Sequence, residues 1–182
     1  MGAVTAGGPV IGILASDRGP GEAERANLMS ETGRLFARRG ARLVCLAENG
    51  VLPMPLISAA RTAGGSVELL ADADLALPPA LAGIAMSVVP ERAARLAQLA
   101  GSVEVLVGLP GSLASASALF GAWAAGQQLP VVMLNRHRAY EAVKGFAADV
   151  LFHSVRNYDR QIQFADSVED LWNKVSWVLQ QR

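Results

Sequence analysis

Short apolar runs that alternate with longer amphipathic segments constrain this sequence more than any other feature. The clearest runs are VIGILA at 10–15, ARLVCLA at 41–47, SVEVLVGLP at 102–110 and LPVVMLN at 129–135. Continuous apolar runs are typical of strands covered on both faces, whereas a half-exposed strand alternates apolar and polar residues. Strands that alternate with helices predict an α/β fold of Rossmann-like type, a doubly wound, mostly parallel sheet with helices on both faces.

The remaining segments complete this pattern. Weaker strands are expected at 66–70 and 162–164, and the Ala-, Asp- and Pro-rich segment 71–85 is expected to be irregular. Helices are expected at 23–39, 52–62, 91–99, 115–125, 139–147 and 168–180. A chain of 182 residues without an internal repeat is expected to form a single domain over 1–182, with residues 1–9 flexible.

Composition excludes several classes of function. The 16 Lys and Arg residues balance the 16 Asp and Glu residues, so no nucleic-acid partner is expected. The single cysteine, Cys45, cannot form an internal disulfide, is expected to be a buried free thiol and indicates no metal site. The uncharged stretch 105–127 is long enough to span a bilayer, but Pro110 and several glycines and serines interrupt it. The N-terminus lacks a signal-peptide pattern, so we expect a cytoplasmic protein without a membrane partner.

The stretch LPGSLASASALFGAW at 109–123 is the most informative loop. Ligands of open parallel sheets bind beyond the carboxyl ends of the strands, and the first turn of a helix offers backbone N–H groups to an anion such as phosphate. Gly111 lets a ligand approach the backbone, and Ser112, Ser115 and Ser117 add hydroxyl donors. The same residues are equally typical of a helix N-cap with close helix–sheet packing. Both interpretations stand at this point.

Other polar residues follow the remaining strands and are expected at the same edge. They are Ser16, Asp17 and Arg18, then Glu48, Asn49 and Gly50, then the NRHR loop from Asn135 and Arg136 through His137 to Arg138. The NRHR arginines could hold an anionic group, or the loop could simply be solvated. The first loop could contact a nucleotide base or sugar, or be an ordinary polar turn. The sequence assigns His137 no acid partner, and His153 is expected to be half-buried.

Common motifs for nucleotides, metals and hydrolysis are missing. GxGxxG is absent after 10–15, and GxxxxGK[ST], HExxH and GxSxG are absent throughout. However, a series of segments matches one family in order: RRGARLV, ENGVLPMPLISAARTAGGSV, the Glu91-Arg92 helix start, the 110–118 turn, and LPVVMLN followed by Tyr140. Together they resemble the LOG family, also called lysine-decarboxylase-like, and its relatives the molybdenum-cofactor carrier proteins.

The resemblance implies a homodimer that binds phosphate through the glycines and threonine of a PGGxGTxxE motif. In this chain the motif is degenerate. Pro110 and Gly111 match, whereas Ser112 and Ala114 replace glycines and Ser115 replaces the threonine while keeping a hydroxyl. The LOG enzymes cleave the N-glycosidic bond of nucleoside 5′-monophosphates, with an Arg and a Glu linked to catalysis.

The catalytic pair implied by the resemblance is incomplete. Arg92 matches the motif arginine, but Ala118 stands in place of the motif glutamate. The catalytic residues therefore stay unassigned, and Arg92 is the one candidate. Losing a group that stabilises the sugar cation or positions water lowers a rate by roughly 10²–10⁴-fold. A phosphate cradle built from backbone and hydroxyls survives that loss.

We therefore expect a protein that binds a nucleotide or a phosphorylated pterin-type cofactor without glycosidase activity. Such a protein would require no cofactor of its own and would take a small phosphorylated ligand. One alternative is an active nucleoside 5′-monophosphate N-glycosidase that uses a relocated carboxylate, Glu48 or Asp17. A second alternative is a ligand-free protein that binds a partner.

Overall fold

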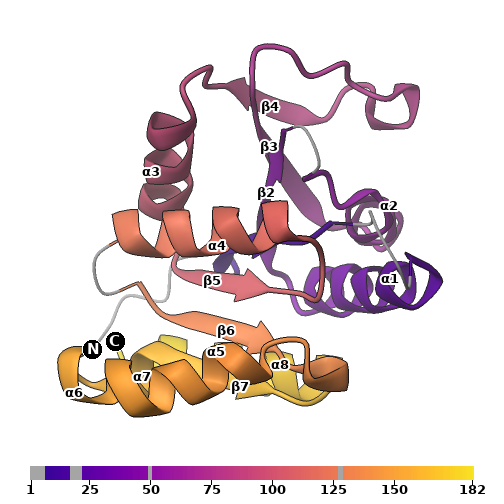
Figure 1. The fold of residues 1–182 in the computed structure, drawn as a ribbon. Helices are drawn as coiled ribbons and strands as arrows, with labels where there is room; N and C mark the ends of the chain where they lie inside the picture. Colours follow the sequence, from indigo (N-terminus) through magenta and orange to yellow (C-terminus); the bar gives the residue numbers. More distant parts are fainter. Residues whose placement is uncertain (1–6, 17–21, 49–50, 127–128) are drawn as a thin grey trace.

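The computed structural model describes residues 7–16, 22–48, 51–126 and 129–182, which form one parallel sheet flanked by helices (Figure 1). Within these ranges the sheet has seven strands, in the order β4-β3-β2-β1-β5-β6-β7. The strands are β1 (Val10–Leu14), β2 (Arg42–Ala47), β3 (Ser66–Ala71), β4 (Ala85–Val88), β5 (Val105–Gly108), β6 (Val131–Leu134) and β7 (Ile162–Ala165). Every neighbouring pair is parallel, so the predicted α/β, Rossmann-like fold is confirmed.

The helices cover both faces of the sheet (Figure 1). They are α1 (Glu22–Arg38), α2 (Met54–Thr62), α3 (Arg92–Ser102), α4 (Leu113–Ala125), α5 (Glu141–Phe146), α6 (Phe152–Ser154), α7 (Tyr158–Gln161) and α8 (Val168–Gln180). Buried side chains of α1, α2 and α8 form one core with the sheet. Buried side chains of α3 and α4 form a second core on the other face. No helix among the described residues is long and apolar enough to cross a membrane.

Burial on both faces explains the continuous apolar runs. In β1, Ile13 packs into the first core and Leu14 into the second. In β2, Cys45 packs into the first core and Leu46 into the second. Cys45 is fully buried, as predicted, and burial raises the pKa of its thiol to about 12. The thiol is therefore protonated at neutral pH and a poor nucleophile.

The structure differs from the sequence prediction at β4, at the helical segment after β6 and at the short helix α7, which was not predicted. Segment 71–85 contains a 3-10 turn at Pro79–Leu81 and leads into β4, which was not predicted. Strand β4 pairs only with β3 at the sheet edge, and its Met86 and Val88 are exposed, so it lacks the continuous apolar signature of an internal strand.

The helical segment after β6 is the second difference. The helix predicted at 139–147 is α5, which continues through a π-helical turn at Ala147–Leu151 into α6. His153 in α6 is exposed rather than half-buried, and its ring lies edge-on to Phe152. The half-buried prediction was wrong because the neighbouring Phe152 is itself exposed on this segment.

Candidate functional site

The strand order reverses beside β1, and the loops after β1 and β5 meet there. Strand β1 pairs with β2 on one side and with β5 on the other. A Cβ added to Gly111 would lie 2.4 Å from Ser115 Oγ and 3.1 Å from the backbone nitrogen of Ser16. Any residue larger than glycine would therefore disturb this junction. Three of the predicted residues, Ser16, Gly111 and Ser115, are thus neighbours at the switch point where open α/β sheets bind ligands.

The serine turn is built by its own side chains. Ser112 is the N-cap of α4, and its hydroxyl accepts from the backbone N–H of Ser115 at 3.3 Å. The buried hydroxyl of Ser115 accepts from the backbone N–H of Ser112 at 2.9 Å and donates to the Ser112 carbonyl at 2.9 Å. These two hydroxyls form a capping box and rigidify the turn. As in any helix, the N–H groups of the first two residues, Leu113 and Ala114, have no intrahelical acceptor.

Arg25 in the first turns of α1 reaches this turn. Its Nη1 donates to the carbonyl of Gly111 at 2.6 Å. Its Nε and Nη2 are both buried and have no hydrogen-bond partner within the described chain. A guanidinium is always charged in a protein, and burying charged donors without partners is unfavourable. Arg25 therefore presents two unused donors beside Gly111.

Sequence reasoning missed Arg25. It lies off the apolar face of an amphipathic helix, where arginine is usually solvated. Only its place near the start of the helix after β1 could have indicated a role at the carboxyl edge.

A buried ion pair lies beyond the end of β2. The carboxylate of Glu48 is 8% exposed, and Arg95 of α3 is 3% exposed. Arg95 Nε donates to Glu48 Oε2 at 2.9 Å, and Arg95 Nη2 donates to the same oxygen. Arg95 Nη1 donates to the carbonyls of Val89 at 2.6 Å and Pro90 at 3.1 Å. All three nitrogens of this arginine are therefore used to hold Glu48 and the entry to α3.

Arg92 connects this pair to the serine turn. Its Nε lies 3.7 Å from Glu48 Oε1, and its Nη2 donates to Ser117 Oγ at 3.3 Å. The Arg92 side chain is about half exposed, at 49%. The two predicted residues Arg92 and Ser117 are thus in direct contact, and the carboxylate next to them is Glu48.

The residue at the position of the motif glutamate, Ala118, is part of the hydrophobic core. Ala118 is fully buried and belongs to the core beneath α4, together with Leu119 and Ala122. Helix α4 consequently brings no carboxylate to Arg92.

The loop after β6 uses Asn135 structurally. Its amide Nδ2 donates to Glu141 Oε2 at 2.8 Å, and its Oδ1 accepts from the backbone N–H of Tyr140 at 2.7 Å. The hydroxyl of buried Tyr140 donates to the carbonyl of Leu109 at 2.8 Å, which ties this loop to the end of β5. Burial raises the pKa of Tyr140 above its ordinary value.

The rest of the NRHR loop is exposed. Arg136 begins a short 3-10 turn, and His137 and Arg138 have left-handed backbones with φ of 52° and 60°. His137 Nε2 contacts Glu24 Oε1 of α1, which is the acid partner that the sequence could not assign. Arg136 follows β6, and within the described ranges it makes no hydrogen bond to the serine turn. Asp17, Arg18, Asn49 and Gly50 lie outside the described residues.

Across the described part of the chain no group of three or more His, Cys, Asp or Glu side chains is placed to hold a metal ion.

No family model and no curated protein matches this sequence. Solved structures match it over almost its whole length. The molybdenum cofactor carrier protein of Chlamydomonas reinhardtii is 22% identical, with a TM-score of 0.71 over 94% of this chain and 98% of the carrier. The molybdenum cofactor binding protein of Rippkaea orientalis is 20% identical, with a TM-score of 0.67 over 96% of this chain and 99% of that protein.

A more distant match has a different partner. DNA processing protein A of Helicobacter pylori, which binds single-stranded DNA, is 14% identical, with a TM-score of 0.61 over 93% of this chain and 80% of its own. At such identities these likenesses establish the Rossmann-like fold, and the ligand must be argued from the site.

Proposed function

We propose that this chain binds a small phosphate-bearing molecule, a nucleotide or a phosphorylated pterin-type cofactor, at the carboxyl edge between β1 and β5. The observation that carries the proposal is the guanidinium of Arg25, whose buried Nε and Nη2 have no partner in the described structure. A phosphate oxygen placed beside Gly111 would accept from this group and remove the cost of burying its unpaired donors.

The surroundings suit the same anion. The first turn of α4 carries the positive end of the helix dipole and two backbone N–H groups without intrahelical acceptors. The absence of a side chain at Gly111 lets the turn lie close to Ser115 and to the backbone of Ser16. Ser112 and Ser115 act in this proposal mainly by fixing the turn, since their hydroxyls already bond to each other's backbone. Asn135 and Arg136, which follow β6, remain in the proposed site, as do Asp17 and Gly50, which lie outside the described residues.

The likeness to molybdenum-cofactor carriers supports a phosphorylated pterin-type ligand. The proteins from Chlamydomonas and Rippkaea are described as a carrier and as a binding protein of that cofactor. Arg25 and the turn would hold its phosphate, and any chemistry would belong to the cofactor itself. A homodimer, as the resemblance implies, also belongs to the proposal and is tested by the mass of the protein in solution.

The proposed protein is not a glycosidase. Ala118 replaces the motif glutamate and is buried in the core, and Glu48, the described carboxylate that contacts Arg92, is held by Arg95. A carboxylate that is buried and neutralised by a guanidinium is poorly suited to donate a proton or activate water.

One observation favours the alternative of an active N-glycosidase. Glu48 Oε1 lies 3.7 Å from Arg92 Nε, so a carboxylate and the motif arginine do meet, although the carboxylate follows β2 instead of lying on α4. In that case Glu48 would stabilise the developing sugar cation, and Glu48→Gln would abolish the release of free base.

The test combines binding and turnover. Purified protein is titrated with AMP, GMP and inorganic phosphate by calorimetry. Release of free base from AMP and GMP is then measured by chromatography of the same samples. The proposal predicts saturable binding without base release. Base release that disappears in Arg92→Ala and Glu48→Gln would establish the glycosidase instead. No binding of any phosphate compound by folded protein would leave the partner-binding alternative.

A further inference from the structure

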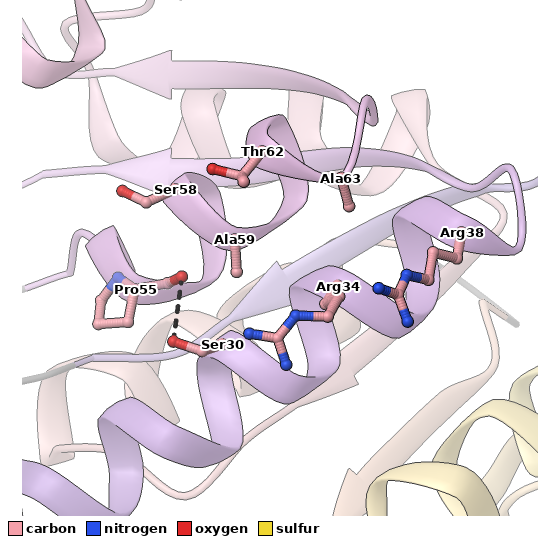
Figure 2. Close-up of a pocket in the computed structure, with 8 residues that line it drawn as sticks. All are labelled: Ser30, Arg34, Arg38, Pro55, Ser58, Ala59, Thr62 and Ala63. Carbon is pink, nitrogen blue, oxygen red and sulfur yellow. Dashed lines mark hydrogen bonds between the residues drawn. The ribbon is translucent and has the colours of Figure 1, made fainter.

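A groove with a volume of about 340 Å³ runs between α1 and α2, away from the serine turn (Figure 2). Its lining residues are Ser30, Arg34 and Arg38 on α1 and Pro55, Ser58, Ala59, Thr62 and Ala63 on α2. Figure 2 shows Arg34 and Arg38 along α1, Ala59 and Ala63 directed toward α1, and the hydroxyls of Ser58 and Thr62 on the α2 side, directed away from the arginines. Cationic and hydroxyl-bearing side chains therefore both line a hollow that has no part in the proposed function.

The groove forms because α1 and α2 nearly touch at Gly33, and the residues of α2 that follow this contact have small side chains. A Cβ added to Gly33 would lie 2.3 Å from the carbonyl oxygen of Leu56, so the helix backbones meet there without a side chain between them. Ser30 Oγ donates to the carbonyl of Pro55 at 3.4 Å and closes one end. Beyond this contact, the short side chains of Ala59 and Ala63 leave space opposite the long arginines.

The groove is positively charged. Arg34 and Arg38 lie one helical turn apart, so their like charges share one face of α1. Neither has an ion pair or a hydrogen bond to another side chain within the part of the chain that the structure describes, and no acidic residue lines the groove. The chain as a whole has no net charge, so this concentration of cations is local.

A third arginine borders the groove. An adjoining hollow of about 380 Å³ shares Ser58 and Thr62 and adds Arg61 and Ala80. Arg61 Nη1 donates to the carbonyl of Ala80 at 3.2 Å, which holds its guanidinium at the rim. Ser58 and Thr62 thus line both hollows, one together with Arg34 and Arg38 and the other together with Arg61.

We infer that this groove is a second anion site, which binds a phosphate-bearing compound with at least two negative charges. Guanidinium groups pair with phosphate in a bidentate geometry, and serine and threonine hydroxyls donate to the remaining oxygens. The volume lies within the range of roughly 300–1,000 Å³ that is usual for small-molecule sites. A dianion would also relieve the repulsion between Arg34 and Arg38.

Calorimetric titration of the full-length protein with inorganic pyrophosphate tests this inference. The variant Arg34→Gln/Arg38→Gln should bind pyrophosphate at the groove at least about tenfold more weakly, because two charge-assisted pairs are lost. Ser58→Ala/Thr62→Ala should weaken the same step by a smaller factor. The control Arg42→Gln removes an exposed arginine that does not line the groove and should change nothing.

The variants also separate this site from the proposed one. Arg25→Gln should leave the groove step intact, and Arg34→Gln/Arg38→Gln should leave the step at the serine turn intact. Higher ionic strength should weaken the groove step, since its arginines are exposed. The inference is overturned if the double variant binds pyrophosphate as wild type does. It is overturned equally if Arg42→Gln weakens binding as much as the double variant, because this would indicate general surface charge.

Discussion

Arg95 shows how much a single buried charge can depend on its partner. It is 3% exposed, and all of its guanidinium nitrogens bond to Glu48 or to the carbonyls that precede α3. We predict that Arg95→Met lowers the free energy of unfolding by about 3–5 kcal/mol, because Glu48 is left buried and unpaired. Urea denaturation followed by circular dichroism measures the change.

Arg92→Met is the matched control for that variant. Arg92 is half exposed and contacts the other oxygen of Glu48 at the longer distance of 3.7 Å, so its loss should change stability by at most about 1 kcal/mol. Equal losses in the two variants would contradict the assignment of Arg95 as the principal partner of Glu48.

Cys45 gives a prediction with a defined pH dependence. Burial raises its thiol pKa from 9.0 to about 12 in the folded state, whereas the unfolded thiol keeps the lower value. The folded chain therefore retains a proton that the unfolded chain loses, and the contribution to stability falls as pH rises from about 9 toward 12. Between pH 7 and 9 the native thiol should react with iodoacetamide only after unfolding, as mass spectrometry can follow. Rapid labelling of native protein would contradict this burial.

The turn before α4 is the element on which the site depends. We predict that Gly111→Ala abolishes binding of AMP at the serine turn while the protein remains folded, because the new methyl group would meet Ser115 Oγ and the Ser16 backbone. Gly101→Ala is a suitable control, since nothing lies within 4 Å of its Cβ position in α3. That control should bind normally and be slightly more stable, because alanine favours a helix more than glycine by about 1 kcal/mol. Calorimetry and thermal unfolding report both effects, and unchanged binding by Gly111→Ala would contradict the proposed site.

Elements with a strong local signal were predicted well. Helix α8 has the predicted bounds of 168–180, and the internal strands β1, β2, β5 and β6 lie within the predicted apolar runs. Strand β4 was missed because it is an exposed edge strand whose pairing with β3 decides its structure. The π-helical turn after α5 leaves no comparable pattern in the sequence, because a single inserted residue changes the helical phase only locally.

At the scale of the whole molecule, the doubly wound order explains why loops far apart in sequence meet. Placing β5 beside β1 brings Gly111 next to Ser16, a contact that the rule for strand carboxyl ends could predict. The reach of single side chains was not predictable. Arg25 bonds to the serine turn and Arg95 holds Glu48, yet in sequence both look like ordinary surface arginines on amphipathic helices.

The central claim is that Arg25 completes a phosphate site, and titration of AMP into Arg25→Gln tests it most directly. Wild type and the surface control Arg42→Gln are measured in parallel, with circular dichroism to establish that each protein is folded. The account predicts that AMP binds Arg25→Gln at least about tenfold more weakly than wild type, since a charge-assisted pair is worth roughly 1.5–3 kcal/mol. Binding of AMP by folded Arg25→Gln with the affinity of wild type would contradict the account.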